Sequence, residues 1–284
     1  MSLAVRCRWL VVVSAVACGC GGSGGGSTPS TPTPLPTPLP TPPIAGFTFN
    51  YESGVSSADR TLIEGGIRTA QALFEGRFGR AISVPTIVNV VAGDGPGTAQ
   101  AQGHLITIYS GNSGWIRASS TGHLKTVVHE AFHVLQNEAG WAVINDPTQR
   151  LQTEWLSEGS AEYVGYAGVI EAGATSYAAV RACEVQIYFN GGGASTPPLQ
   201  TIIFRPSEGA SVNSRYAIAW IAVDRLTNGL DGIARLKGMW EAVGAWDQRF
   251  QAAFSRTPAG FYSEFADYRQ GLVPGGGAAN CASH

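Results

Sequence analysis

Charge is scarce in this chain. Of its 284 residues only 13% are Asp, Glu, Lys or Arg, and 18 basic against 20 acidic side chains leave a formal net charge of −2. A protein that binds nucleic acid through its phosphates needs a basic field, which this composition does not supply, so we expect no nucleic-acid partner. A hydrophobic content of 44% is ample for a packed core, as in a soluble globular protein.

Long apolar runs are also missing near the N-terminus. The run Trp9–Val13 is far shorter than the roughly 20 residues that cross a bilayer, so a permanent membrane span is not expected. Arg6 and Arg8 precede this run and small residues follow it, which is the order typical of a secretory signal sequence. We therefore predict that residues 1–20 are a signal peptide and that the protein is exported.

Two cysteines lie at the end of this leader. Residues 15–18 (AVAC) resemble the bacterial lipobox, whose cysteine is lipidated and becomes the mature N-terminus, and residues 17–20 (ACGC) are a second, overlapping match. We expect an N-terminal lipid anchor on Cys18 or Cys20, which would attach the protein to a membrane of the bacterial cell envelope. The alternative is ordinary signal cleavage, which would release a secreted protein without lipid.

Residues 21–43 are predicted to be a linker. They begin as a glycine run, which behaves as a flexible coil, and continue as alternating Thr and Pro, which favour polyproline II. At about 3.1 Å per residue the proline-rich part makes a spacer on the order of 50 Å. Residues 44–284 are then expected to form one domain, with its ordered part ending near Gly271, because we find no repeat and no second linker inside it.

Only two cysteines, Cys183 and Cys281, remain outside the leader. In an oxidising compartment they could form a disulfide that holds the C-terminal tail against the core. Two unpaired thiols are the alternative.

The domain is predicted to begin with a helix and a small sheet. Apolar residues recur near the helical period over residues 58–78. Residues 84–91 and 104–109 are rich in Val, Ile and Thr, as strands are, and turn-forming glycines at 93–97 separate them. After residue 121 the chain is expected to be mostly helical, so the predicted fold class is α+β.

The helix expected from about Thr121 to Glu138 carries His129-Glu130-Ala131-Phe132-His133, the His-Glu-x-x-His pattern. Residues four apart lie on one helical face, so both imidazoles can reach a single metal ion while Glu130 stands beside it as general base. The opposite face is apolar and consists of Leu124, Val127, Val128, Ala131, Val134 and Leu135. This pattern predicts a helix with a buried back and a polar front that bears both histidines.

A second predicted helix carries Glu154, Glu158 and Glu162 at a spacing of four. A catalytic zinc site needs a third protein ligand and an open position for water, and two His with one Glu is a known ligand set. The residues around the stripe are large and apolar: Trp155, Leu156, Tyr163 and Val164. They predict a buried helix, in which carboxylates without a cation would be costly, although a solvated face is the alternative. Small Gly159 and Ala161 are expected to let this helix approach the first closely.

Together the two segments resemble the gluzincin metallopeptidases, and especially the bacterial peptidase-MA-like domains. That pattern is HEXXHxLQ followed by WLxEGxAEY, and this chain has HEAFHVLQ at 129–136 and WLSEGSAEY at 155–163. The resemblance implies a zincin-like fold, in which a small mixed sheet packs on the active-site helix and a mostly helical C-terminal half follows.

The resemblance also implies a set of site residues. His129, His133 and Glu158 would bind Zn²⁺. Glu154 lies outside the matched positions and is the fallback third ligand. Glu162 matches the position of a carboxylate that hydrogen-bonds a ligand imidazole, here that of His129, and so fixes the tautomer and orientation of the ring.

The implied reaction is hydrolysis of peptide bonds in a peptide or protein substrate. Zinc lowers the pKa of its bound water to about 7, and Glu130 takes the proton and returns it to the leaving amine. Tyr216 is the candidate donor to the oxyanion, because residues 215–220 resemble the third helix of the family pattern, and Tyr166 competes with it.

Residues 104–109 have two possible roles. In zincins an edge strand above the active-site helix receives the substrate backbone by β-augmentation, and these residues are placed to do so. A plain core strand is the alternative. His104 and His123 are expected to be structural or surface residues.

Two other functions remain open at this point. The protein could be a lipoprotein that keeps the zinc-site architecture as a surface binding module without turnover, or a zinc amidase that acts on a non-peptide substrate. Glu130 argues against the first, because a binding module has no use for a base there. The sequence does not exclude the second.

Overall fold

The computed structural model describes residues 43–140, 147–193, 196–204 and 212–274. All of them belong to one compact unit, Pro43–His284. The predicted signal peptide, Cys18, Cys20 and all of the predicted linker except Pro43 lie outside the described residues. In the part of the chain that is described, no helix combines the length and the apolar character that crossing a bilayer requires.

The first half of the unit contains a four-stranded mixed sheet with the order β1-β2-β4-β3. Strands β1 (Phe47–Tyr51), β2 (Thr86–Val91) and β4 (Leu105–Tyr109) are parallel, and β3 (Ala99–Gln102) runs antiparallel to β4. The sequence predicted β2 and β4 but missed both outer strands. The segment between β2 and β4 is therefore not a simple turn, because it contains β3.

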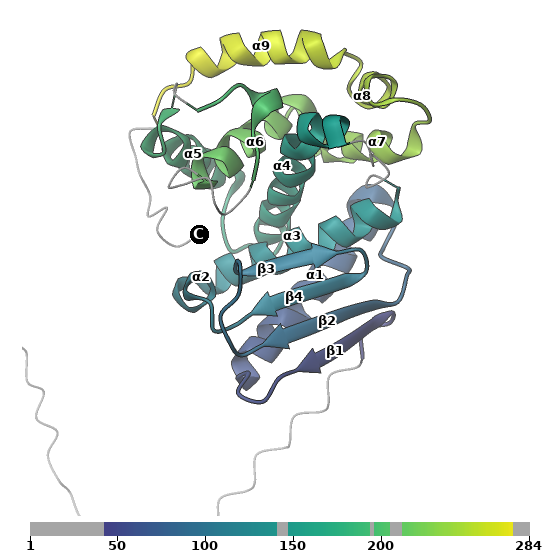
Figure 1. Ribbon diagram of the computed structural model, residues 1–284, viewed down its shortest axis with the longest axis vertical. Coiled ribbons are helices and arrows are strands. Elements are labelled where there is room, and N and C mark those ends of the chain that lie inside the picture. Colours follow the sequence, from purple (N-terminus) through teal and green to yellow (C-terminus); the bar gives the residue numbers. More distant parts are fainter. Residues whose placement is uncertain (1–42, 141–146, 194–195, 205–211, 275–284) are drawn as a thin grey trace, which may run out of the picture. The chain divides into compact units, whose positions relative to one another are not determined.

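Residues 104–109 were one candidate for the strand that receives substrate, and the sheet order corrects this. Strand β4 lies between β2 and β3, so its backbone is paired on both sides and the core-strand alternative is right. The outer strand on this side is β3, which packs next to helix α3 (Ser120–Glu138). Figure 1 shows β3 as the strand nearest to α3.

Helices α1 (Ser57–Phe78) and α3 pack together and share one hydrophobic core with the sheet. Alternate residues of β2 and β4 are fully buried in this core: Val88, Val90, Ile106 and Ile108. On the helices, the ring of Phe132 lies 5.8 Å from that of Phe74 and 5.7 Å from that of Phe78. The apolar back of α3 is thus fixed against α1, which leaves its other face for the histidines.

The second half is helical, which confirms the predicted α+β class. Its main helices are α4 (Pro147–Glu171), α5 (Tyr177–Asn190), α6 (Val212–Thr227), α8 (Trp246–Phe254) and α9 (Pro258–Gln270). The short helical turns are α2 (Ser113–Arg117), η3 (Leu199–Thr201), η5 (Leu230–Lys237) and α7 (Gly238–Glu241). Helix α4 packs on α3 along one side and on α6 along another (Figure 1).

Glycines allow α4 to approach both neighbours closely. A β-carbon at Gly165 would lie 2.9 Å from the carbonyl oxygen of Lys125 in α3, and one at Gly159 would lie 2.7 Å from the carbonyl oxygen of Ala219 in α6. We expected Gly159 to serve the contact with α3, and this was wrong. Gly165 and Gly168, further along the helix, occupy the face of α4 that meets α3, whereas Gly159 occupies the face that meets α6.

Cys183 lies on α5, where it is buried and disulfide-bonded. The other half of the predicted pair, Cys281, lies outside the described residues.

Candidate metal centre

Three side chains from two helices converge at the middle of the unit. His129 and His133 project from α3 and Glu158 from α4, and one ligand atom of each lies within 4.8 Å of the other two. The two Nε2 atoms are 3.1 Å apart, and Oε2 of Glu158 is 3.5 Å from that of His129 and 3.4 Å from that of His133. The structure thus brings together the three residues that the sequence proposed as metal ligands.

These separations are close to those expected of a tetrahedral zinc site. Ligand atoms about 2.0–2.2 Å from a common centre are about 3.3–3.6 Å apart when they sit at tetrahedral corners. The three measured edges, 3.1, 3.4 and 3.5 Å, are close to that range. Two imidazole nitrogens and one carboxylate oxygen are also ligands that zinc accepts, so the residues present fit the ion.

The other ring nitrogen of each histidine is held by a hydrogen-bond acceptor. Nδ1 of His129 lies 3.1 Å from Oε2 of Glu162, and Nδ1 of His133 lies 2.8 Å from Oε1 of Gln136. Both Nδ1 atoms must therefore carry a proton, which leaves the lone pair of each neutral ring on Nε2, facing Glu158. This is the tautomer that metal binding through Nε2 requires.

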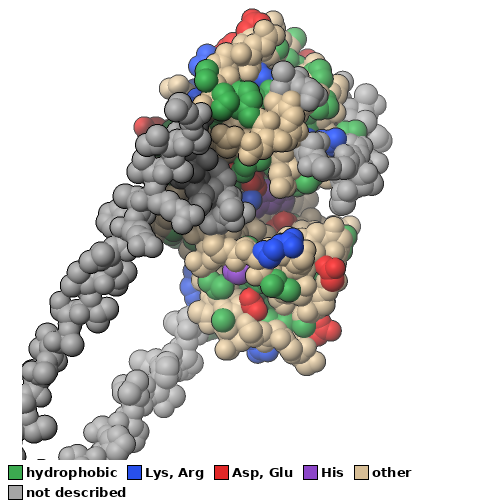
Figure 2. All heavy atoms as spheres, turned by 90° about the vertical axis from the view of Figure 1, so that its left-hand side faces the viewer, with side chains coloured by type: hydrophobic (Ala, Val, Ile, Leu, Met, Phe, Trp, Pro, Cys, Tyr) green, Lys and Arg blue, Asp and Glu red, His purple; other side chains and the backbone are tan. Residues whose placement is uncertain are grey.

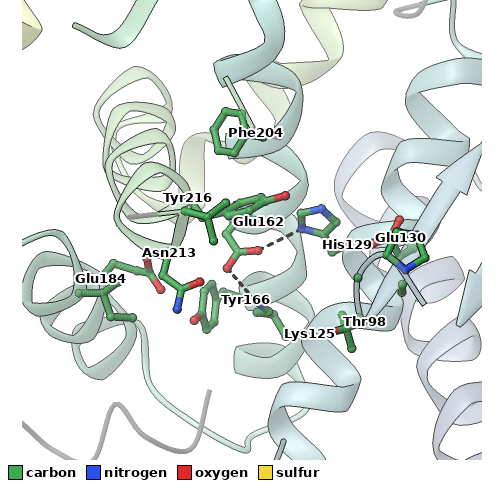
Figure 3. A pocket seen from close by; sticks show the side chains of 16 residues that line it. Thr98, Lys125, His129, Glu130, Glu162, Tyr166, Glu184, Phe204, Asn213 and Tyr216 are labelled. Atoms are coloured by element: carbon green, nitrogen blue, oxygen red, sulfur yellow. Dashed lines mark hydrogen bonds and ion pairs between the residues drawn. The ribbon is translucent and has the colours of Figure 1, made fainter. Parts of the chain in front are cut away.

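Glu162 is itself held by a lysine from α3. Nζ of Lys125 lies 2.7 Å from Oε1 of Glu162, while Oε2 of the same carboxylate faces His129 (Figure 3). Burial raises the pKa of Glu162, but Lys125 and His129 outweigh it and bring this pKa to about 2. The carboxylate is therefore ionised beside His129, as the sequence expected. Lys125 itself was not expected, although its spacing of four from His129 was visible.

Gln136 is the second partner that the sequence interpretation missed. Its side-chain NH₂ donates to the backbone carbonyl of Ser157 at 3.2 Å and to the hydroxyl of Ser160 at 2.9 Å. Both serines lie on α4, so Gln136 fixes the ring of His133 and at the same time ties α3 to the helix that carries Glu158. Gln136 is 3% exposed, and a buried amide with its polar atoms satisfied holds its geometry well.

Without a metal, the cluster is stabilised by protons. Burial lowers the pKa of His129, but hydrogen bonds to Glu158 and Glu162 outweigh this and bring it to about 10. The pKa of His133 is also raised, against burial, chiefly by Glu158. Burial raises the pKa of Glu158, yet the two imidazoles hold it well below its usual range. A divalent cation can replace these protons with little change in the charge of the cluster.

Glu130 follows His129 on α3 and reaches the same cleft. Its side chain is 7% exposed, and burial raises its pKa above the usual value. A carboxylate whose pKa is shifted toward neutrality is better matched to taking up and returning a proton near pH 7. The position and burial of Glu130 therefore suit a general base.

The cleft has a volume of about 410 Å³. It is lined by residues 96–99 on the sheet side, which include the start of β3, and by side chains of α3, α4, α5 and α6. Figure 2 shows acidic, basic and histidine side chains gathered in a hollow between the two parts of the compact unit. Of the three candidate ligands, His129 therefore stands beside Glu130 in the wall of this cleft.

Two tyrosines line this cleft, and they differ in what they contact. The hydroxyl of Tyr216 donates to Oε2 of Glu158 at 3.4 Å, and its ring lies 6.0 Å from the ring of His129. The ring of Tyr166 instead lies under the ammonium group of Lys125, with Nζ 5.3 Å from the ring centre. Of the two candidates for the oxyanion donor, Tyr216 is the one that contacts a candidate metal ligand.

The remaining candidates lie apart from the three ligands. Oε1 of Glu154, the fallback ligand, accepts a hydrogen bond from the backbone N–H of Phe204 at 3.4 Å. His104 is exposed, and His123 stacks on Trp115 with ring centres 4.1 Å apart. Both histidines match the structural or surface roles expected of them.

A comparison of the chain with protein-family models and with curated protein sequences finds no match.

Proposed function

We propose that this protein is a zinc-dependent peptidase of the gluzincin type, with a zincin-like fold. The observation that carries the proposal is the triangle of His129, His133 and Glu158 at separations close to those of a tetrahedral zinc site, with Glu130 beside His129 in the wall of the cleft. The match of residues 129–136 and 155–163 to the peptidase-MA-like pattern adds support, because it concerns these same residues.

The chemistry divides between the ion and the protein. A zinc ion bound here would supply a water of lowered pKa and a positive charge that polarises the scissile carbonyl. Glu130 accepts the proton of the attacking water and later donates it to the leaving amine. His129 and His133 stay in the tautomer that Glu162 and Gln136 impose. A base in this position supports a hydrolase over a binding module.

Tyr216 is the proposed donor to the oxyanion of the tetrahedral intermediate. Burial, above all, and then the negative charge of Glu158 raise its pKa well above the usual value, so its hydroxyl keeps its proton across the working pH range. A donor that already points at a ligand oxygen can turn to a substrate oxygen bound beside it.

Strand β3 is the proposed platform for the substrate backbone. It pairs with β4 on one side and forms the outer edge of the sheet on the other. Ala99, at its start, lines the cleft together with Thr98 and Glu130. A peptide that added to β3 as a further strand would carry one of its carbonyl groups past the metal ligands. This gives β3 the role that the sequence interpretation had considered for residues 104–109.

The site of action is also a proposal, since it rests on the sequence alone. An export signal over residues 1–20, lipidation of Cys18 or Cys20 and a spacer over residues 21–43 would place the peptidase in the bacterial cell envelope, or outside the cell if the lipid is missing.

The test uses one variant at Glu130 and one at Glu154. Purified protein is expected to contain one zinc per chain and to digest a mixed peptide library. Glu130→Gln keeps the zinc and loses at least about 100-fold in kcat, because removal of a general base costs about 10² to 10⁴. The matched change Glu154→Gln leaves both properties unaltered. Full peptidase activity in Glu130→Gln would refute the proposal, as would a protein that binds no zinc.

A further inference from the structure

One carboxylate in the cleft has no role in the proposed reaction. Glu184 projects from α5 into the cleft that also holds His129 and Glu130, and only 2% of it is exposed (Figure 3). A buried carboxylate is costly unless a positive charge or hydrogen bonds compensate it. The hydroxyl of Tyr166 donates one hydrogen bond to Glu184.

The positive charge of Lys125 is already paired with another carboxylate. Lys125 lines the same cleft, but its ammonium group lies 2.7 Å from Glu162 and compensates that carboxylate. Within the described residues, no basic side chain forms an ion pair with Glu184. Burial first, and then the charge of Glu162, raise the pKa of Glu184 to about 8, so the carboxyl group is largely protonated near pH 7 unless a cation lies beside it.

A balance of the charges described in the cleft also singles out Glu184. Lys125 and Glu162 cancel each other, and the two charges of a bound zinc ion would balance Glu158 and Glu130. Among the acidic side chains that the structure describes in the cleft, Glu184 is then the one whose ionised form no described cation balances. A cation brought by the substrate would favour the ionised form of Glu184 and pair with it.

The walls of the cleft suit a long side chain with a charged end. Phe204, which packs against Tyr216, and Ile187, one turn beyond Glu184 on α5, give apolar surface. Asn213 lies beside Glu184 and adds an amide (Figure 3). Lysine and arginine combine an aliphatic stem with a cationic head and so match an apolar passage that ends at a carboxylate.

We propose that Glu184 is a specificity-determining residue, which binds the cationic head of a lysine or arginine side chain of the peptide that is cleaved. This inference rests on the proposed peptidase function and names its substrate class. It adds a recognition site at the α5 side of the cleft, away from the residues that carry out the hydrolysis.

The test compares arginine with citrulline, which has the same shape but no charge. A set of pentapeptides carries one or the other at each position in turn, and kcat/KM is measured for zinc-loaded protein. At one position the wild type is expected to prefer arginine about 10- to 100-fold, since hydrogen bonds to charged groups contribute about 1.5–3 kcal/mol. Glu184→Gln removes this preference and keeps kcat/KM for the citrulline peptide within about twofold.

A second variant tests the proposal even if Glu184→Gln does not fold. Asn213→Asp adds a carboxylate to the wall of the same cleft and is expected to raise the preference for arginine. An arginine preference that survives Glu184→Gln, or a wild type that cleaves both peptides equally well at every position, overturns the proposal.

Peptide binding measured in a variant that does not turn over tests this inference separately from the peptidase function. The same peptides are titrated into zinc-loaded Glu130→Gln protein, and into that protein with Glu184→Gln added. Tighter binding of the arginine peptide that needs Glu184 supports the recognition site even if the wild type cleaves nothing, in which case only the peptidase proposal fails. Cleavage of peptides together with equal binding of arginine and citrulline supports the peptidase function and overturns the recognition site.

Discussion

Zinc binding should release protons, and the number released follows from the structure. Without a metal, His129 has a pKa of about 10 and the pKa of His133 is also raised, because both rings face Glu158. At pH 7.5 the ring of His129 is therefore almost fully protonated. Zinc binds the neutral rings, so each bound ion should displace at least about one proton, the one that His129 carries.

The assay is calorimetric titration of zinc into metal-free protein, at pH 7.5, in buffers of different ionisation enthalpy. The slope of the observed enthalpy against the buffer enthalpy gives the number of protons. The apparent affinity should rise at least about 10-fold per pH unit between pH 7 and 9, because each displaced proton contributes a factor of ten. Fewer than half a proton released would refute the account of the cluster.

The raised pKa of His129 also predicts how the stability of the metal-free protein changes with pH. The folded-state pKa of His129 lies above the unfolded value of about 6.5. Its contribution to the stability of the metal-free protein is therefore fully present below pH 6.5 and is lost as the pH rises through about 10. The melting temperature of the metal-free protein should fall over this window, and that of the zinc-loaded protein should fall less.

Three further predictions concern ligands, packing and turnover. Glu158→Ala should weaken zinc binding by more than 10-fold and Glu154→Ala by less than twofold, as measured by competition with a chelator. The reverse order would identify Glu154 as the third ligand. Gly165→Ala should lower the free energy of unfolding by about 1–3 kcal/mol, because the added β-carbon meets the backbone of α3. Gly76→Ala lies on an open helix face and should raise the free energy of unfolding by about 0.5–1 kcal/mol. Urea denaturation of both variants tests this. Tyr216→Phe should lower kcat about 100-fold with little change in KM, and an unchanged kcat would exclude it as the oxyanion donor.

The core of the site could be predicted because local rules govern it. A spacing of four on a helix places His129 and His133 on one face whatever the rest of the chain does. The same rule could have identified Lys125, four residues before His129, and the neighbouring spacing of three could have identified Gln136 beside His133. Both spacings were visible in the sequence.

The parts that could not be predicted depend on long-range packing. Strand β3 has the sequence AQAQ, which contains no β-branched or aromatic residue, and only pairing with β4 makes it a strand. Glu184 lies on a helix whose spacing to the metal ligands carries no signal, and it joins the cleft because α5 packs on α6 and α6 on α4.

The most direct test of the central claim is a crystal structure of the zinc-loaded protein with anomalous scattering measured at the zinc edge. One strong peak is expected about 2.0–2.2 Å from Nε2 of His129, Nε2 of His133 and a carboxylate oxygen of Glu158, with a water at the fourth position. A peak elsewhere, or one at the histidines with Glu158 turned away and no other acid in its place, would contradict the account.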